Sequence, residues 1–283
     1  MAVIYAFCCL ACAACNDFIF KLSTRHVRSK GQFVTLVGIC WFFALAFLPR
    51  NPESSWTMTL LWGSISGFFS VTSNILLIEA MARQSAGICS TIFRLNMVLV
   101  VLGATLFLSE TLIPLQWGGI ILAILAVLAF LPRKSEAEST SKDTRTIGFI
   151  MVLAAALLRA GMGLSYKYGF LQGADQNGVA AINSIFWILG GIIYALAAEH
   201  NFQLPDKKSL GFGVLSGLLV SGIVFFMAAS LKIGNASIVL PIAQMSFLGT
   251  LFLSVIFLKE KLDMRKIAAV ICGTAAILLL TLA

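Results

Sequence analysis

The sequence predicts an all-α integral membrane protein with ten transmembrane helices arranged as two inverted five-helix repeats. Three observations lead to this prediction: an apolar composition, long runs without charge, and an internal repeat. Of the 283 residues, 59% are hydrophobic and 11% are charged, and the mean hydropathy is +0.96. An average soluble domain has about 45–50% apolar and about 25% charged residues. Twelve acids and twenty bases cannot supply a polar exterior, so lipid is the expected surroundings.

The charge-free runs have the length of membrane-spanning helices. Residues 210–231 and 236–258 contain no charged side chain, and a helix needs about 20 residues to cross the hydrocarbon layer. A lipid-exposed backbone must satisfy its hydrogen bonds within the protein, which leaves helices or a closed barrel. Barrel strands would be about half as long and would alternate in polarity. The expected helices are 2–22, 32–48, 58–82, 86–108, 113–131, 147–168, 178–198, 209–231, 236–258 and 265–282.

One polar segment, residues 132–146, has the composition of a linker and separates two similar halves, 1–131 and 147–283. In the first two helices an offset of 146 residues relates Lys21 to Lys167 and Trp41 to Trp187. In the last three helices the offset is 150, and the matching segments are Ser66-Gly67 with Ser216-Gly217, residues 108–112 with 258–262, and Gly119 and Ala123 with Ala269 and Gly273. Because each half crosses the membrane five times, the second copy is inverted. Secondary transporters use inverted repeats to alternate access to a midplane site.

The basic residues of the loops predict the orientation. Lys and Arg gather in the loops that follow odd-numbered helices, whereas the other loops hold only Arg50, Lys167 and Lys232. Since cytoplasmic loops carry the excess of Lys and Arg, the odd loops are expected in the cytoplasm and both termini outside it. Residues 1–4 lack the basic start of a secretory signal, so the first apolar run is expected to be retained as helix 1 of a cell inner membrane protein.

With these features the chain resembles the drug/metabolite transporter superfamily of the EamA type. The resemblance covers essentially the whole chain and rests on Lys21 and its mate Lys167, on Leu-x-Glu-x-Leu turns at Glu110 and Glu260, and on Pro241 within helix 9. It implies a ten-helix transporter with a cavity lined by helices 1, 3, 4, 6, 8 and 9. Thr91 stands where a partner for Pro241 would fall, and helix 2 lacks an Arg that is frequent in the family. The superfamily's cargo ranges over amino acids, sugars, nucleotide derivatives and drugs.

Two arginines lie deep in the expected helices. Arg159 is about 18 Å and Arg94 about 12 Å from the start of its helix, at about 1.5 Å per residue. A charge at this depth costs about 2.5–3.5 kcal/mol on insertion scales, so it requires a partner, water or a function. We expect one or both guanidinium groups to face the central cavity and bind a carboxylate or phosphate of the substrate. The alternative is a structural ion pair with Asp17 or Glu79, or snorkelling to the interface.

Further polar and aromatic residues are expected to line the same cavity. Gln244 is the repeat mate of Arg94. Pro241 is expected to kink helix 9 near the midplane, either at the binding site or as a plain packing kink. The remaining candidates for substrate contacts are Asn74, Asn96, Asn183 and Trp187, although a membrane-embedded Asn also commonly bonds a neighbouring helix.

Five residues are candidates for gating or ion coupling, and Pro241 with its expected kink is one of them. Asp17 and Glu79 are the acids within expected spans and could carry a coupled proton. Each also precedes a base by four residues, the spacing of a helical ion pair. Lys21 and Lys167 recur in both halves and are expected either to gate the cavity or to snorkel.

The expected function is therefore that of an exporter: a secondary transporter of small polar metabolites such as amino acids, driven by a gradient, with protons as a coupling ion. We expect no enzymatic activity, cofactor, metal or nucleic-acid partner, and either a monomer or a homodimer. The cysteines of helix 1, at 8, 9, 12 and 15, are interpreted as packing residues. A membrane-embedded enzyme and a channel or scaffold protein are the alternatives; His26 and His200 lie outside known catalytic motifs.

Overall fold

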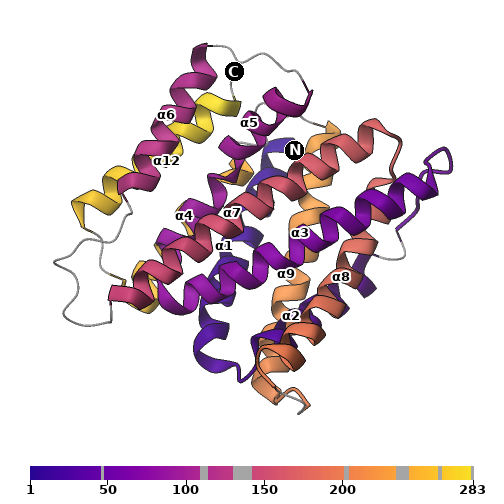
Figure 1. Cartoon of the computed structure of the whole chain (residues 1–283), viewed down its shortest axis with the longest axis horizontal. Coiled ribbons are helices and arrows are strands. Elements are labelled where there is room, and N and C mark those ends of the chain that lie inside the picture. Colours follow the sequence, from indigo (N-terminus) through magenta and orange to yellow (C-terminus); the bar gives the residue numbers. More distant parts are fainter. Residues whose placement is uncertain are drawn as a thin grey trace.

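The computed structural model describes residues 1–45, 48–108, 114–129, 142–200, 204–233, 242–260 and 263–281. Within these ranges every regular element is a helix (Figure 1). The helices are α1 (Ala2–His26), α2 (Lys30–Leu45), α3 (Trp56–Arg83), α4 (Ala86–Arg94), α5 (Asn96–Leu108), α6 (Pro114–Ala129), α7 (Lys142–Leu171), α8 (Gln176–Ala197), α9 (Lys207–Ile233), α11 (Ser246–Leu258) and α12 (Met264–Thr281).

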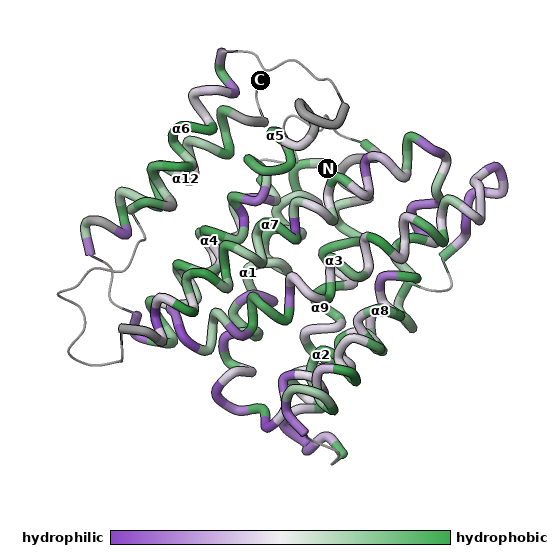
Figure 2. Tube along the Cα trace, viewed as in Figure 1, coloured by the Kyte–Doolittle hydropathy of each residue, from purple (hydrophilic) through white to green (hydrophobic). Residues whose placement is uncertain are grey.

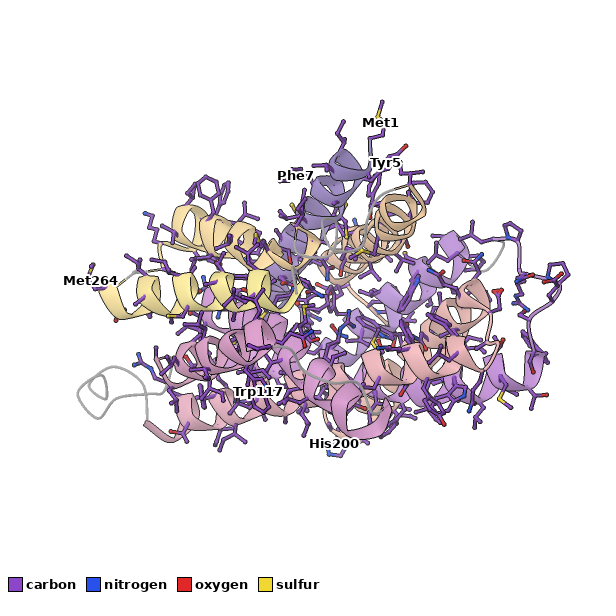
Figure 3. The ribbon with its side chains drawn as sticks, turned by 90° about the horizontal axis from the view of Figure 1, so that it is seen from above. Met1, Tyr5, Phe7, Trp117, His200 and Met264 are labelled. Carbon is purple, nitrogen blue, oxygen red and sulfur yellow. The ribbon has the colours of Figure 1, made fainter. Side chains whose placement is uncertain are left out.

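The helices have the length and surface of membrane spans. α1, α3, α7, α8 and α9 each contain a segment long and apolar enough to cross a bilayer, and five shorter apolar helices accompany them. Hydrophobic residues follow the length of the helices, while hydrophilic residues concentrate near their ends (Figure 2). Large apolar side chains such as Phe7, Trp117 and Met264 are exposed and point outward (Figure 3). This apolar exterior suits lipid rather than water.

Two helices break at equivalent places. The expected fourth span is interrupted at Leu95, whose φ of −70° and ψ of 0° form a turn between α4 and α5. Met245, 150 residues later, has φ −74° and ψ 7° and precedes α11. The Leu95 N–H reaches the carbonyls of both Thr91 and Ile92, each at 3.2 Å, and the Met245 N–H reaches the carbonyl of Ile242, three residues back, at 3.2 Å. The sequence predicted an unbroken span over 86–108 and therefore not the turn at Leu95.

α7 begins earlier in the chain than the expected span of 147–168. α7 begins at Lys142, so residues 142–146 are helical, although their composition had assigned them to the linker. An unbroken run of backbone hydrogen bonds extends the helix past the apolar segment. Pro241, the expected cause of a kink in helix 9, lies outside the described residues.

Helices of the two halves pack against one another. α2 crosses α8, α3 packs on α7, and α1 packs on α9, while α6 and α12 form a pair at one edge of the molecule (Figure 1). Glycine permits the closest crossing. A Cβ atom on Gly38 would lie 2.8 Å from the backbone nitrogen of Ile188 and 3.0 Å from the carbonyl oxygen of Ser184. Small residues at such crossings bring membrane helices into backbone contact.

Candidate functional site

A cavity of about 360 Å³ lies between the two halves of the chain. Its walls come from α1, α2, α3, α4, α7, α8, α9 and residues 242–244. The residues that line it are Cys9, Ala13, Asn16, Asp17, Trp41, Ser70, Asn74, Phe93, Arg94, Arg159, Met162, Tyr166, Phe170, Gln176, Ala180, Trp187, Val220, Ile223, Val224, Met227, Ala243 and Gln244. Its volume is within the range of about 300–1,000 Å³ for small-molecule sites.

Three charged residues line this cavity among those the structure describes. Asp17 of α1 and Arg94, the last residue of α4, form an ion pair in which Oδ2 and Nη2 are 3.3 Å apart. Their side chains are only 4% and 12% exposed. Arg159 of α7 lies with Nη1 3.1 Å from the sulfur of Met162 and with its guanidinium 5.8 Å from the ring centre of Phe93. The lining charges sum to one net positive charge.

Aromatic rings form much of the remaining wall. Trp41 of α2 and Trp187 of α8 meet edge to face, with ring centroids 5.8 Å apart and planes at 84°. The Trp187 indole N–H donates to Ser70 Oγ at 2.9 Å. Tyr166 packs against Phe170, at a centroid distance of 5.7 Å. Such rings bury apolar area and present faces and edges to a flat ligand.

Two buried donors on lining residues have no hydrogen-bond partner in the part of the chain that the structure describes. They are Nε1 of Trp41 and Nε of Arg94. An unpaired buried donor costs about 1–3 kcal/mol. Both groups can therefore gain free energy if an acceptor reaches them when the surrounding helices shift.

The structure brings together six of the twelve predicted residues. Arg94, Arg159, Gln244, Asn74, Trp187 and Asp17 all line the cavity, where their proposed roles stay predictions. The Asn74 amide is partly used, because Nδ2 donates to the Ser70 carbonyl at 2.8 Å.

Two of the predicted asparagines, Asn96 and Asn183, are not among the residues that line this cavity, and their contact with substrate stays a prediction. The Asn96 amide donates to the carbonyl of Phe93. Asn183 accepts from Ser66 Oγ at 2.9 Å and donates to Tyr166. Both amides thus form hydrogen bonds with other residues of the helices, which is the alternative role of asparagine in a membrane.

Glu79, a predicted coupling residue, is not among the residues that line the cavity. Glu79 accepts from Lys30 Nζ at 2.5 Å and from the Tyr194 hydroxyl at 2.7 Å, and it pairs with Arg83. Arg83, four residues after Glu79, is thus the ion-pair partner that the sequence spacing predicted. Asp17, by contrast, pairs with Arg94 rather than with the base four residues later.

The two recurring lysines differ. Lys21 does not snorkel: its ammonium donates to the carbonyls of Met81 and Gln84, at 2.5 Å for the latter. Lys167 is exposed on α7. Neither lysine is among the residues that line the cavity.

Some lining residues were not predicted from the sequence. Met162, Tyr166 and Phe170 occupy the same face of α7 as the predicted Arg159, at helical spacing. A search of that face for polar and aromatic residues beside Arg159 would have found Tyr166. Asn16 carried a weaker signal: it is adjacent to Asp17 and accepts from Ser216 Oγ at 2.6 Å.

A larger hollow, of about 750 Å³, lies at the surface between residues 49–54 and 170–177. Of its two carboxylates, Glu53 and Asp175, the second already accepts from the backbone N–H groups of Asn51, Asn177 and Gly178. Loop and helix-capping bonds thus occupy Asp175.

Comparison with known proteins identifies the family. The model of the EamA-like transporter family matches residues 1–131 and 146–282. The chain belongs to this family. It is therefore a multi-pass membrane transporter of the drug/metabolite transporter superfamily, as the resemblance in its sequence indicated. The family match does not specify a cargo for this EamA-like chain.

Two individual proteins are similar to this EamA-like transporter. An uncharacterized protein of Methanocaldococcus jannaschii is 29% identical over 107 residues, which cover 35% of this chain and 78% of that protein. A solved crystal structure with 15% sequence identity covers 98% of this chain and 95% of its own chain, with a TM-score of 0.57. This second likeness concerns the fold alone.

Proposed function

We propose that this chain is a secondary transporter that exports small polar metabolites, such as amino acids or related compounds, by alternating access. The observation that carries the proposal is the charged cavity between the two halves. Asp17 and Arg94 come from the first half and Arg159 and Gln244 from the second, so relative movement of the halves would change the site directly. Transporters place their substrate sites at such an interface.

We further propose that the chain spans the membrane ten times as two inverted repeats, residues 1–131 and 147–283 with a linker between them. Residues related by the repeat contact each other or make equivalent contacts, which supports a two-fold relationship. Gly38 meets Ser184, its counterpart at the offset of 146. A Cβ on Gly67 would meet Phe186, and one on Gly217 would meet Cys40, the counterpart of Phe186.

Two comparisons with known proteins support the division of the chain into two halves. The family model matches each half separately. The Methanocaldococcus jannaschii relative matches over most of its length but over about a third of this chain, so it is about half as long as this chain. A relative of this length supports a division of the chain into two units.

One end of the cavity is sealed by polar contacts. Glu79 ties α3 to α2 and α8. Lys21 ties α1 to the end of α3, and Glu260 accepts from the Ala86 N–H at the start of α4, at 2.9 Å. Glu199 accepts from the Lys30 N–H at 2.8 Å. All of these groups lie at helix ends joined by the loops after odd-numbered spans.

The cavity extends toward the opposite end. Phe170 is near the end of α7, and Gln176 is the first residue of α8. With the basic odd loops in the cytoplasm, this arrangement represents an outward-facing state with the cytoplasmic side closed. Glu79 and Lys21 would then be gate residues, and the protein would sit in the cell inner membrane with both termini outside.

The two helix breaks supply a means of movement. Arg94 and Gln244 each immediately precede a break, at Leu95 and Met245. A helix that is already interrupted can change direction there with little loss of hydrogen bonding. Bending at these points would carry the two cavity residues with it. Asp17 would take up a coupled proton when Arg94 moves away.

A counterflow assay tests the transport proposal. The protein is reconstituted in liposomes preloaded with unlabelled metabolite, and uptake of the labelled metabolite is followed. Saturable uptake that needs internal substrate is expected. Uptake that stays linear with concentration would instead indicate a channel, and chemical turnover of the metabolite would indicate an enzyme. Liposomes with protein of one orientation determine the direction, and an imposed pH gradient tests proton coupling.

A further inference from the structure

We propose that the cavity selects small organic carboxylates that carry an aromatic ring and no ammonium group. This inference deepens the proposed transport function and rests on it for the identity of the site. It narrows the cargo within small polar metabolites, and it favours an organic acid over the amino acid of the same skeleton.

The charges of the cavity support an anion. Asp17 already has an opposite charge 3.3 Å away in Arg94. Arg159 contacts a sulfur atom and a ring, and no hydrogen bond or ion pair joins it to a carboxylate among the described residues. A carboxylate beside Arg159 would complete the charge balance of the site. A guanidinium group binds a carboxylate through two parallel hydrogen bonds.

An ammonium group would find no equally good place. The acid available to it, Asp17, is bound to Arg94, and both arginines repel a cation. A zwitterion would also leave the net positive charge of the cavity unbalanced. Aromatic rings can attract cations, but the guanidinium of Arg159 already occupies the neighbourhood of the Phe93 ring.

The body of the ligand follows from the aromatic walls. Trp41 and Trp187 meet edge to face, and Tyr166 and Phe170 form a second pair. Their rings favour offset or edge contacts with a flat ligand. The volume of about 360 Å³ is near the lower end for small-molecule sites, so a single-ring ligand is the suitable size.

The differences between the two halves at the charged positions predict how the ligand would lie in the cavity. Arg159 corresponds to Ala13 at the offset of 146, and Asp17 corresponds to Gly163. The halves thus share a framework but differ at the charged positions. The free positive charge lies on α7, while the neutralised one lies between α1 and α4. A carboxylate would bind on the α7 side, with its ring toward the tryptophans.

Three probes with the same ring test the inference. Binding of 3-phenylpropanoate, phenylalanine and 2-phenylethylamine to the purified protein is measured by calorimetry, and each is tested in counterflow. The carboxylate is expected to bind about tenfold or more tightly than phenylalanine, and the amine is not expected to bind. Equal or tighter binding of phenylalanine, or no binding of the carboxylate, would overturn the inference.

Substitutions at Arg159 test whether this residue binds the carboxylate. Arg159→Gln should weaken carboxylate binding by about tenfold to a hundredfold, and Arg159→Lys should restore part of it. Arg50→Gln is the matched control, because Arg50 lies over Trp56 at the surface, outside the cavity. Unchanged binding in Arg159→Gln would reject the assignment. If Arg159→Gln does not fold, the three-probe comparison in the unaltered protein decides alone.

Counterflow and binding together distinguish a failure of the transport function from a failure of the carboxylate selectivity. Saturable counterflow of phenylalanine in preference to the carboxylate would retain the transporter and reject the selectivity. Selective carboxylate binding without counterflow would reject transport through this site and retain the selectivity.

Discussion

Trp41 and Trp187 meet edge to face in the cavity, 5.8 Å between ring centroids, although 146 residues separate them in the chain. One tryptophan belongs to each half of the chain, so their contact lies where the two halves meet, and the predicted repeat makes them counterparts. Their hydrogen bonding is nevertheless unequal. Trp187 donates to Ser70, whereas the indole nitrogen of Trp41 has no partner among the described residues.

This inequality predicts different costs for the same substitution. Trp187→Phe removes a buried hydrogen bond and leaves the Ser70 hydroxyl unpaired, so it should cost about 1 kcal/mol more in the free energy of unfolding than Trp41→Phe. Both variants keep a ring in the pair. Thermal unfolding of the two purified variants in the same detergent measures the difference. Equal melting temperatures would show that the Ser70 bond contributes nothing to stability.

The Asp17–Arg94 pair predicts strong non-additivity. Either Asp17→Asn or Arg94→Gln leaves the other group buried with its partner removed, which costs about 3–5 kcal/mol. The double variant removes both charges and should cost much less than the sum of the single changes. A double-mutant cycle on unfolding free energies measures this coupling. Additive effects would mean that the two side chains do not interact in the folded protein.

The crossing of α2 and α8 predicts opposite effects for two glycine substitutions. Gly38→Ala places a methyl group 2.8 Å from a backbone nitrogen of α8, so the helices must separate. Overpacking of this kind costs about 1–3 kcal/mol. Gly211→Ala, in α9, meets nothing within 4 Å and should gain about 0.5–1 kcal/mol from the lower chain entropy of alanine.

Thermal unfolding compares these two variants directly. A melting temperature that falls for Gly38→Ala and stays or rises for Gly211→Ala is expected. If Gly38→Ala is as stable as Gly211→Ala, the close crossing of α2 and α8 is absent from the protein in its membrane.

The Glu79 contacts predict the behaviour of the closed end. Glu79→Gln removes the negative charge that holds Lys30 and Arg83. Because hydrogen bonds to charged groups contribute about 1.5–3 kcal/mol, local opening should become about tenfold more frequent. Amide hydrogen exchange at residues 79–87 and 194–199 measures this opening. Exposed Glu53 at the other end provides the control variant Glu53→Gln, which should leave exchange there unchanged.

The position of a residue within an apolar span predicted some of the residues that line the cavity, but not whether a given side chain faces it. Depth within an apolar run placed Arg94 and Arg159 near the middle of the molecule, because a charge far from a helix end has no route to water. The same reasoning chose Asn96 and Asn183, which also lie within spans. Whether an amide faces a cavity or a neighbouring helix depends on helix rotation and crossing angle, and a single helix does not encode these.

The sequence by itself determined the apolar class of the protein, its family and most of its helical segments, and it predicts which residues an internal repeat would relate. Each of these depends on composition, local spacing or direct comparison along the chain. The tertiary structure alone decided that Asp17 pairs with Arg94 instead of Lys21, and that the helices break at Leu95 and Met245. It also decided that Arg159 faces the cavity with no carboxylate bonded to it among the described residues. These relationships join residues far apart in the chain, so they arise only when the helices pack.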